Sequence, residues 1–131
     1  MKATALVFSF LLLSGLSLGC SMVPGYMAKG LVRLPSGATS SCGAAYKQFV
    51  ASFRRHGGWY ELYALDPAQA GKVSFVLDAG LAAKGYLLMS NTDYPVQRSH
   101  NLSYYNPDSD TYVYVKVISQ HQLMSMFING W

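Results

Sequence analysis

The alternation of side chains between Thr111 and Ile118 constrains the fold more than any other feature of this sequence. Three valines alternate there with larger, more polar side chains, and the run contains Tyr112, Val113, Tyr114, Val115, Lys116 and Val117. A period of two residues places neighbouring side chains on opposite faces of a β-sheet. The segment is therefore predicted to be a strand with its valines in the core and its other face partly exposed to water.

A second strand, Leu102–Tyr105, precedes this one across the turn-forming residues Asn106-Pro107-Asp108-Ser109-Asp110, so the two predict a hairpin. Asn106, Asp108 and Asp110 also have the spacing of the first ligands of an EF-hand calcium loop. The later EF-hand positions require glycine and glutamate, and Thr111 and Val117 occupy them. We predict an ordinary turn and no metal site, and nothing in the sequence indicates a cofactor.

The clearest helical pattern begins at Ser40 or Ser41, either of which can cap a helix. Apolar side chains then recur at a spacing that puts them on one helical face: Tyr46, Phe49, Val50 and Phe53. The basic residues of 54–56 and the Gly57-Gly58 pair are typical of a helix C-terminus. We therefore expect an amphipathic helix here.

The remaining segments complete a predicted fold class. Strand-forming residues dominate three further stretches, Trp59–Leu65, Val73–Leu77 and Tyr86–Met89, whereas the polar residues 91–99 predict a loop. The tail from Ser119 places Leu123, Met126 and Phe127 at helical spacing. The sequence thus predicts an α+β fold, with one N-terminal amphipathic helix packed on a mostly antiparallel sheet of four or five strands and a short C-terminal helical tail.

The first nineteen residues have the layout of a secretory signal. Lys2 is followed by an uncharged stretch from Ala3 to Gly19, whose centre is apolar and whose end is rich in small residues. A membrane-spanning helix needs about 20 predominantly apolar residues, which this stretch does not reach. We predict a cleaved signal peptide at 1–19, a tether at 20–39 that leads into the domain, and a single globular domain at 40–131.

Cleavage after Gly19 would leave Cys20 as the first residue of the mature chain. The first twenty-one residues resemble a bacterial lipoprotein signal. That resemblance implies that Cys20 carries acyl chains such as palmitate, which would hold the protein to a membrane of the cell envelope. Ser21 stands where an aspartate would retain such a protein at the inner membrane, so the resemblance implies the outer membrane, on its periplasmic side.

A disulfide is the alternative role for Cys20. The chain has two cysteines, Cys20 and Cys42, and exported domains use disulfides. With a Cys20–Cys42 bridge the protein would be a soluble secreted domain without a lipid anchor.

Aromatic residues on the predicted strands suggest a binding surface, made of Trp59, Tyr63, Tyr104, Tyr112 and Tyr114. Exposed tyrosines give a large contact area at a small entropic cost, which suits a protein or a glycan partner. We therefore expect a non-enzymatic binding or assembly module of the cell envelope. The net charge of +4 comes without a run of basic residues, so no nucleic-acid partner is predicted.

An enzymatic alternative depends on Cys42. The predicted helix begins near this residue, and a helix N-terminus favours the reactive thiolate. His100 and His121 follow, and the order of these residues resembles that of the papain-like cell-wall peptidases. That resemblance implies Cys42 as nucleophile, His100 as base and His121 as a further polar residue.

Overall fold

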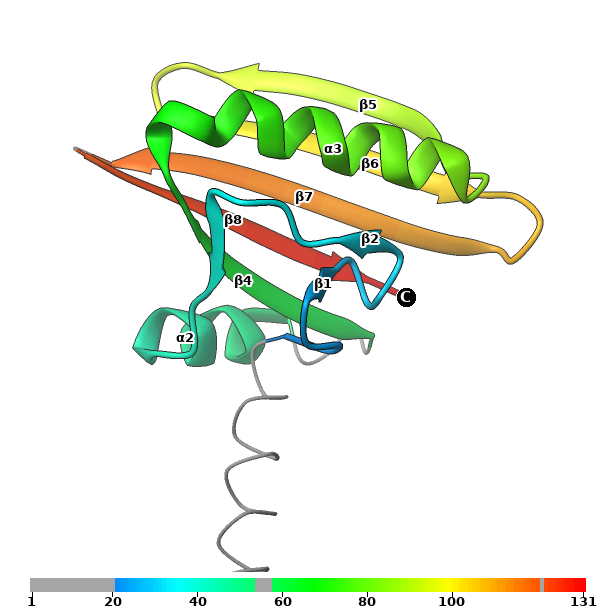
Figure 1. Ribbon diagram of the computed structural model, residues 1–131, viewed down its shortest axis with the longest axis horizontal. Coiled ribbons are helices and arrows are strands. Elements are labelled where there is room, and N and C mark those ends of the chain that lie inside the picture. The colour runs from blue at the N-terminus through cyan, green and yellow to red at the C-terminus, as the bar shows by residue number, and fades with distance from the viewer. Residues whose placement is uncertain (1–20, 54–57, 121) are drawn as a thin grey trace, which may run out of the picture.

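The computed structural model describes residues 21–53, 58–120 and 122–131, and its described part is mostly β-structure (Figure 1). A six-stranded antiparallel sheet has the spatial order β3-β4-β8-β7-β6-β5. Its strands are β3 (Ala38–Ser40), β4 (Trp59–Leu65), β8 (Leu123–Gly130), β7 (Thr111–Gln120), β6 (Ser99–Asn106) and β5 (Leu87–Tyr94). A two-stranded antiparallel sheet contains β1 (Tyr26–Met27) and β2 (Val32–Arg33). The helices are α2 (Ala44–Phe53), the 3-10 turn η2 (Pro67–Gln69) and α3 (Ala70–Ala83).

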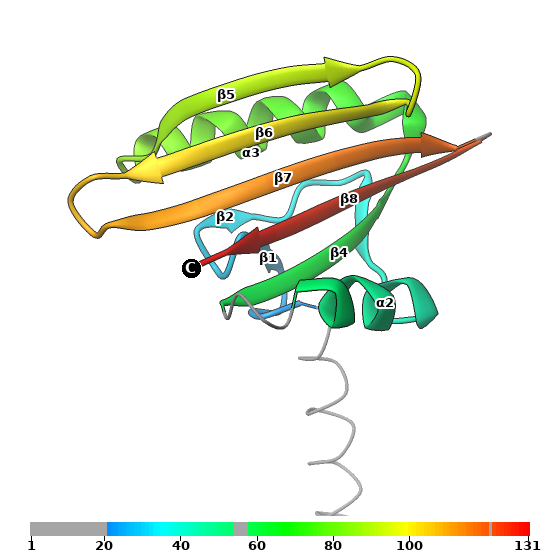
Figure 2. The same cartoon turned by 180° about the vertical axis from the view of Figure 1, so that it is seen from behind.

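One crossover and one meander give this order. After β4 the chain passes through η2 and α3 to the far edge of the sheet, where β5 begins. It then returns strand by strand through β6 and β7, so that β8 lies between β7 and β4 (Figures 1 and 2). Val115 and Ile128 face each other across β7 and β8, and Ile128 is also opposite Glu61 of β4.

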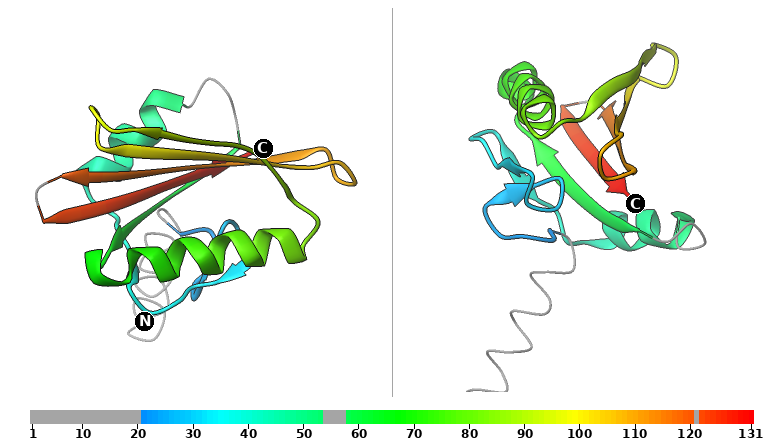
Figure 3. Two further views of the ribbon diagram at one scale, coloured as in Figure 1. Left: turned by 90° about the horizontal axis from the view of Figure 1, so that it is seen from above. Right: turned by 90° about the vertical axis from the view of Figure 1, so that its right-hand side faces the viewer.

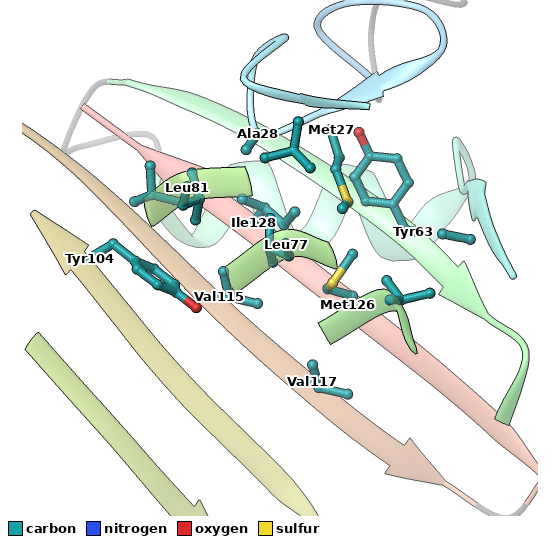
Figure 4. Packing of buried hydrophobic residues seen from close by; sticks show 14 of the residues in the cluster. Met27, Ala28, Tyr63, Leu77, Leu81, Tyr104, Val115, Val117, Met126 and Ile128 are labelled. Atoms are coloured by element: carbon teal, nitrogen blue, oxygen red, sulfur yellow. The ribbon is translucent and has the colours of Figure 1, made fainter. Parts of the chain in front are cut away.

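Helix α3 and the β1–β2 sheet cover the same face of the large sheet, which we call the inner face (Figure 3). Three side chains of α3 recur every four residues and are buried: Val73, Leu77 and Leu81. They pack on alternate residues of the strands, among them Val115, Met126 and Ile128 (Figure 4). Met27 and Ala28 come to this core from the β1–β2 sheet. The opposite side of the sheet, the outer face, is covered by α2 at one end (Figure 2).

A glycine allows α3 to approach the β1–β2 sheet closely. A Cβ atom at Gly80 would lie 2.7 Å from Cγ2 and 2.8 Å from Cγ1 of Val32. Real Cβ atoms essentially never come so close, so Gly80 sets the distance between α3 and β2.

The predicted fold class was wrong. The helix that covers the sheet core is α3 and not the helix near residue 44, and the large sheet has six strands. The predicted strand Val73–Leu77 lies inside α3, whose buried residues follow the period of a helix. Pro67 and the Asp66 side chain, which accepts a hydrogen bond from the backbone N–H of Ala68 at 3.0 Å, start the helical turns.

The C-terminal tail was also predicted wrongly, because it is strand β8. Met124, Met126 and Ile128 alternate toward the inner face, and β8 pairs with strands on both sides. The predicted helix is present as α2 but begins at Ala44. Ser40 belongs to β3, and Ser41 donates its backbone N–H to the carbonyl of Leu62 at 2.9 Å. The predicted loop at 91–99 is shorter, because β5 continues to Tyr94.

The segment predicted as a tether, 20–39, is folded onto the domain from Ser21 onward. Glu61 of β4 is fully buried, and its carboxylate accepts three backbone hydrogen bonds from this segment. Their donors are the N–H groups of Met22 at 3.1 Å, Ala28 at 2.7 Å and Lys29 at 3.2 Å. Both Ala28 and Lys29 have positive φ angles, 55° and 56°, which turn their N–H groups toward the carboxylate.

Strand β5 forms one edge of the large sheet, and all eight of its residues are exposed. Within the described residues, no helix is both long enough and apolar enough to cross a membrane.

Candidate functional site: a groove on the outer face

Helix α2 packs on only one end of the outer face. Its Phe49 ring meets the rings of Tyr60 and Phe127 edge-on, with centroids 5.5 Å and 4.9 Å apart. Tyr60 and Phe127 come from β4 and β8, so α2 lies over these two strands. Among the residues that the structure describes, no helix covers the outer face of β5, β6 and β7 (Figure 2).

A groove of about 790 Å³ lies between α2 and the uncovered strands. Gln48, Phe49 and Ser52 of α2 form one wall, and Thr92 and Tyr94 of β5 form the other. Alternate residues of β6, β7 and β8 form the floor, with Asn101, Ser103, Tyr114, Lys116, Phe127 and Asn129 among them. A concave site with aromatic walls and convergent polar groups is a common form of binding site.

Four aromatic side chains form a row that leads into one end of the groove: Tyr105, Tyr112, Tyr114 and Trp131. The row begins where Tyr105 is directly opposite Tyr112 in the β6–β7 hairpin, with ring centroids 4.7 Å apart. Trp131 lies 6.0 Å from Tyr112 and is stacked at 5.0 Å on Tyr114. Trp131 is held beside β7 by two backbone hydrogen bonds with Tyr112, of 2.8 Å and 3.2 Å. This cross-strand stacking makes the row one continuous surface.

Tyr105 is also fixed from the turn that follows β6. Its hydroxyl donates to Oδ1 of Asp110 at 3.0 Å, and this hydrogen bond raises the pKa of Tyr105 above its ordinary value. This hydrogen bond therefore holds the Tyr105 ring in its place at the start of the row.

The polar part of the groove consists mainly of amides and hydroxyls. Gln48, Asn101 and Asn129 contribute amides, and Ser52, Ser103 and Thr92 contribute hydroxyls. Oδ1 of Asn101 is buried and has no hydrogen-bond partner among the described residues. Lys116 is the one formally charged side chain in the described lining of the groove. Such a lining can donate and accept hydrogen bonds, and it carries one positive charge.

The aromatic residues selected from the sequence lie on both faces of the sheet. Tyr112 and Tyr114 belong to the row on the outer face. Tyr63 and Tyr104 are 0% and 1% exposed in the inner core, and Trp59 packs partly buried against that core. Burial is the main reason why the pKa values of Tyr63 and Tyr104 are raised, and the nearby carboxylates of Glu61 and Asp78 add to it.

Tyr105 and Trp131 were missed in the sequence-based surface. The place of Tyr105 on the outer face could have been predicted by pairing it with Tyr112 across the predicted turn. The place of Trp131 on that face could not have been predicted. It depends on β8 being a strand, whereas the sequence there predicts a helix.

The structure places two residues of the enzymatic alternative, Cys42 and His100, far apart across the large sheet. Cys42 follows β3 and is disulfide-bonded, and the other cysteine of the chain, Cys20, lies outside the described residues. His100 lies on β6, four strand positions from β3 or about 19 Å at the usual strand spacing. Its Nδ1 atom is 3.7 Å from Oδ1 of Asp93. His121 lies outside the described residues.

No family model, curated protein or solved structure matches this chain. Its function is therefore inferred from the geometry of its own residues.

Proposed function

We propose that the protein is an exported domain of the cell envelope that binds a partner in the groove on its outer face. One observation carries this proposal. The uncovered half of the sheet presents a continuous aromatic row, and this row opens into a groove of about 790 Å³. Trp131 is exposed and the three tyrosines of the row are partly exposed. A contiguous accessible aromatic surface is typical of a recognition site, whereas single exposed rings are common on any protein.

Export is supported by two features of the chain. The layout of residues 1–19 is that of a signal peptide. Cys42 is disulfide-bonded, and disulfides persist mainly in oxidising compartments such as the periplasm. The lipid anchor on Cys20 and the outer-membrane location are expectations from the sequence alone, and a disulfide between Cys20 and Cys42 would exclude the anchor.

Site-specific photo-crosslinking of the full-length protein in its native cells tests the binding site. A photo-reactive amino acid at position 92 lies on the wall of the groove. The matched control is position 75, because Phe75 is 73% exposed on α3, which covers the other face of the sheet. We expect an adduct of defined mass from position 92 and none from position 75.

The adduct from position 92 should disappear in a chain with Tyr112→Ser and Tyr114→Ser, and it should persist with Phe75→Ser. Circular dichroism and the urea midpoint show whether each variant folds. Equal adducts from both positions, or an adduct that survives the double tyrosine substitution in a folded chain, would contradict the proposal.

A further inference from the structure

We infer that the ligand of the groove is an acidic glycan, that is, a chain of sugar rings carrying carboxylate groups. This inference rests on the proposed function, because it assigns a ligand class to the same groove. Backbone pairing argues against an added peptide strand on the floor of the groove, and side-chain chemistry and charge favour an acidic glycan.

The backbone of the groove floor is already hydrogen-bonded. Strands β6, β7 and β8 each have a paired strand on both sides. A peptide that binds as an added strand needs the free N–H and C=O groups of a sheet edge. The floor offers none within these three strands, so recognition there depends on side chains.

Those side chains match the chemistry of sugars. A sugar hydroxyl both donates and accepts, and so do the amides of Gln48, Asn101 and Asn129 in the groove. The walls and floor also contain aromatic rings, including Tyr94, Tyr114 and Trp131. The C–H faces of a sugar ring can pack on such apolar surfaces while its hydroxyls reach the amides.

The charge of the lining selects among glycans. Lys116 is exposed and is the one formally charged side chain in the described lining. A carboxylate on the ligand would therefore find a cation and no opposing carboxylate there. An exposed ion pair of this kind is weak, so the expected gain in affinity is about threefold.

Two oligosaccharides of equal length test the inference on the full-length protein. Hyaluronan hexasaccharide carries carboxylates, and the hexamer of β-linked N-acetylglucosamine is neutral. Calorimetry should show that the protein binds both, with the acidic hexamer about threefold tighter at low salt. Lys116→Gln should reduce the affinity for the acidic hexamer to that for the neutral one, whereas Lys84→Gln, in the turn after α3, should leave both affinities unchanged.

Three results would overturn the inference. The first is equal affinity of the unaltered protein for the two hexamers, and the second is a preference for the acidic hexamer that survives Lys116→Gln. The third is binding of neither hexamer while position 92 still gives an adduct with a protein, which would leave the proposed function standing. If position 92 gives no adduct and neither hexamer binds, the proposed function fails together with the glycan.

Discussion

Glu61 is the residue around which the N-terminal segment is folded. Burial raises the pKa of the Glu61 carboxyl above its ordinary value. The hydrogen bonds that it accepts from three backbone N–H groups lower the pKa, but by less than burial raises it. A carboxyl whose pKa is raised on folding binds its proton more tightly in the folded chain. The free energy of unfolding therefore falls as the pH rises from the ordinary pKa of 4.5 through the raised folded value.

Glu61→Gln should remove this part of the pH dependence. The stability of the unaltered protein relative to the variant should decrease with rising pH, by about 1.4 kcal/mol for each unit by which the folded pKa exceeds the ordinary one. Urea unfolding between about pH 4 and pH 8 measures the two slopes. Phe75→Ser, which changes an exposed side chain of α3 that does not titrate, serves as the control and should keep the unaltered slope. Parallel slopes for Glu61→Gln and the unaltered protein would refute this assignment.

The burial of Glu61 could not have been predicted from the sequence. Alternation along Trp59–Leu65 does place Glu61 on the same face as Tyr63 and Leu65. However, a lone glutamate in a strand is ordinarily exposed. Its donors come from residues 22–29, more than thirty positions earlier, and only the tertiary structure shows that their N–H groups converge on it.

Helix α3 contains two glycines with opposite surroundings, and they allow a paired test of the packing between elements. A Cβ at Gly80 would clash with Val32, whereas a Cβ at Gly71 would meet nothing within 4 Å. Alanine favours a helix over glycine at both positions. Gly71→Ala should therefore raise the free energy of unfolding by about 0.5–1 kcal/mol.

Gly80→Ala should instead lower the free energy of unfolding by about 1–3 kcal/mol, because overpacking outweighs the gain in helix propensity. Chemical denaturation of the two variants under the same conditions measures both changes. A gain in stability at Gly80 equal to that at Gly71 would mean that the β1–β2 sheet moves away from α3 at no cost.

The sequence correctly predicted the strands and helices whose local pattern agrees with their tertiary surroundings. The hairpin of β6 and β7 and the strand β4 were predicted because alternation and turn residues point to the same structure. The apolar run Val73–Leu77 suits a short strand as well as a helix, and only its continuation to Leu81 shows the helical period. In β8, the residues Leu123, Met126 and Phe127 fit a helix, but pairing with β4 and β7 fixes the strand.

The state of Cys20 is a property of the whole mature molecule. A lipid thioether on Cys20 and a Cys20–Cys42 disulfide exclude each other, because both need the same sulfur atom. Cys42 is disulfide-bonded, and Ser17 and Gly19 fit the small residues of an ordinary cleavage site. We expect the intact protein from its native envelope to have the mass of residues 20–131 less two hydrogens. A mass increased by acyl chains would instead establish the lipid anchor.

The groove is a product of the whole molecule and could not have been assembled from the sequence. Its walls come from α2 and β5, which lie near opposite ends of the large sheet. Tyr112 and Tyr114 were selected because they alternate with core valines. Asn129 lies in the groove beside Tyr114 only because β8 inserts between β7 and β4. Local sequence patterns do not encode the order of strands in a sheet.

The insertion of β8 between β7 and β4 also governs when the molecule can finish folding. Glu61 and Ile128 are paired, so the centre of the sheet closes a loop that spans about half of the chain. Folding slows as the sequence separation of contacting residues grows. A chain that crosses a membrane unfolded would therefore expose the apolar residues of β4 to other chains until residues 123–130 emerge. We therefore expect that a chaperone that shields β4 during this interval would raise the share of chains that reach the native state.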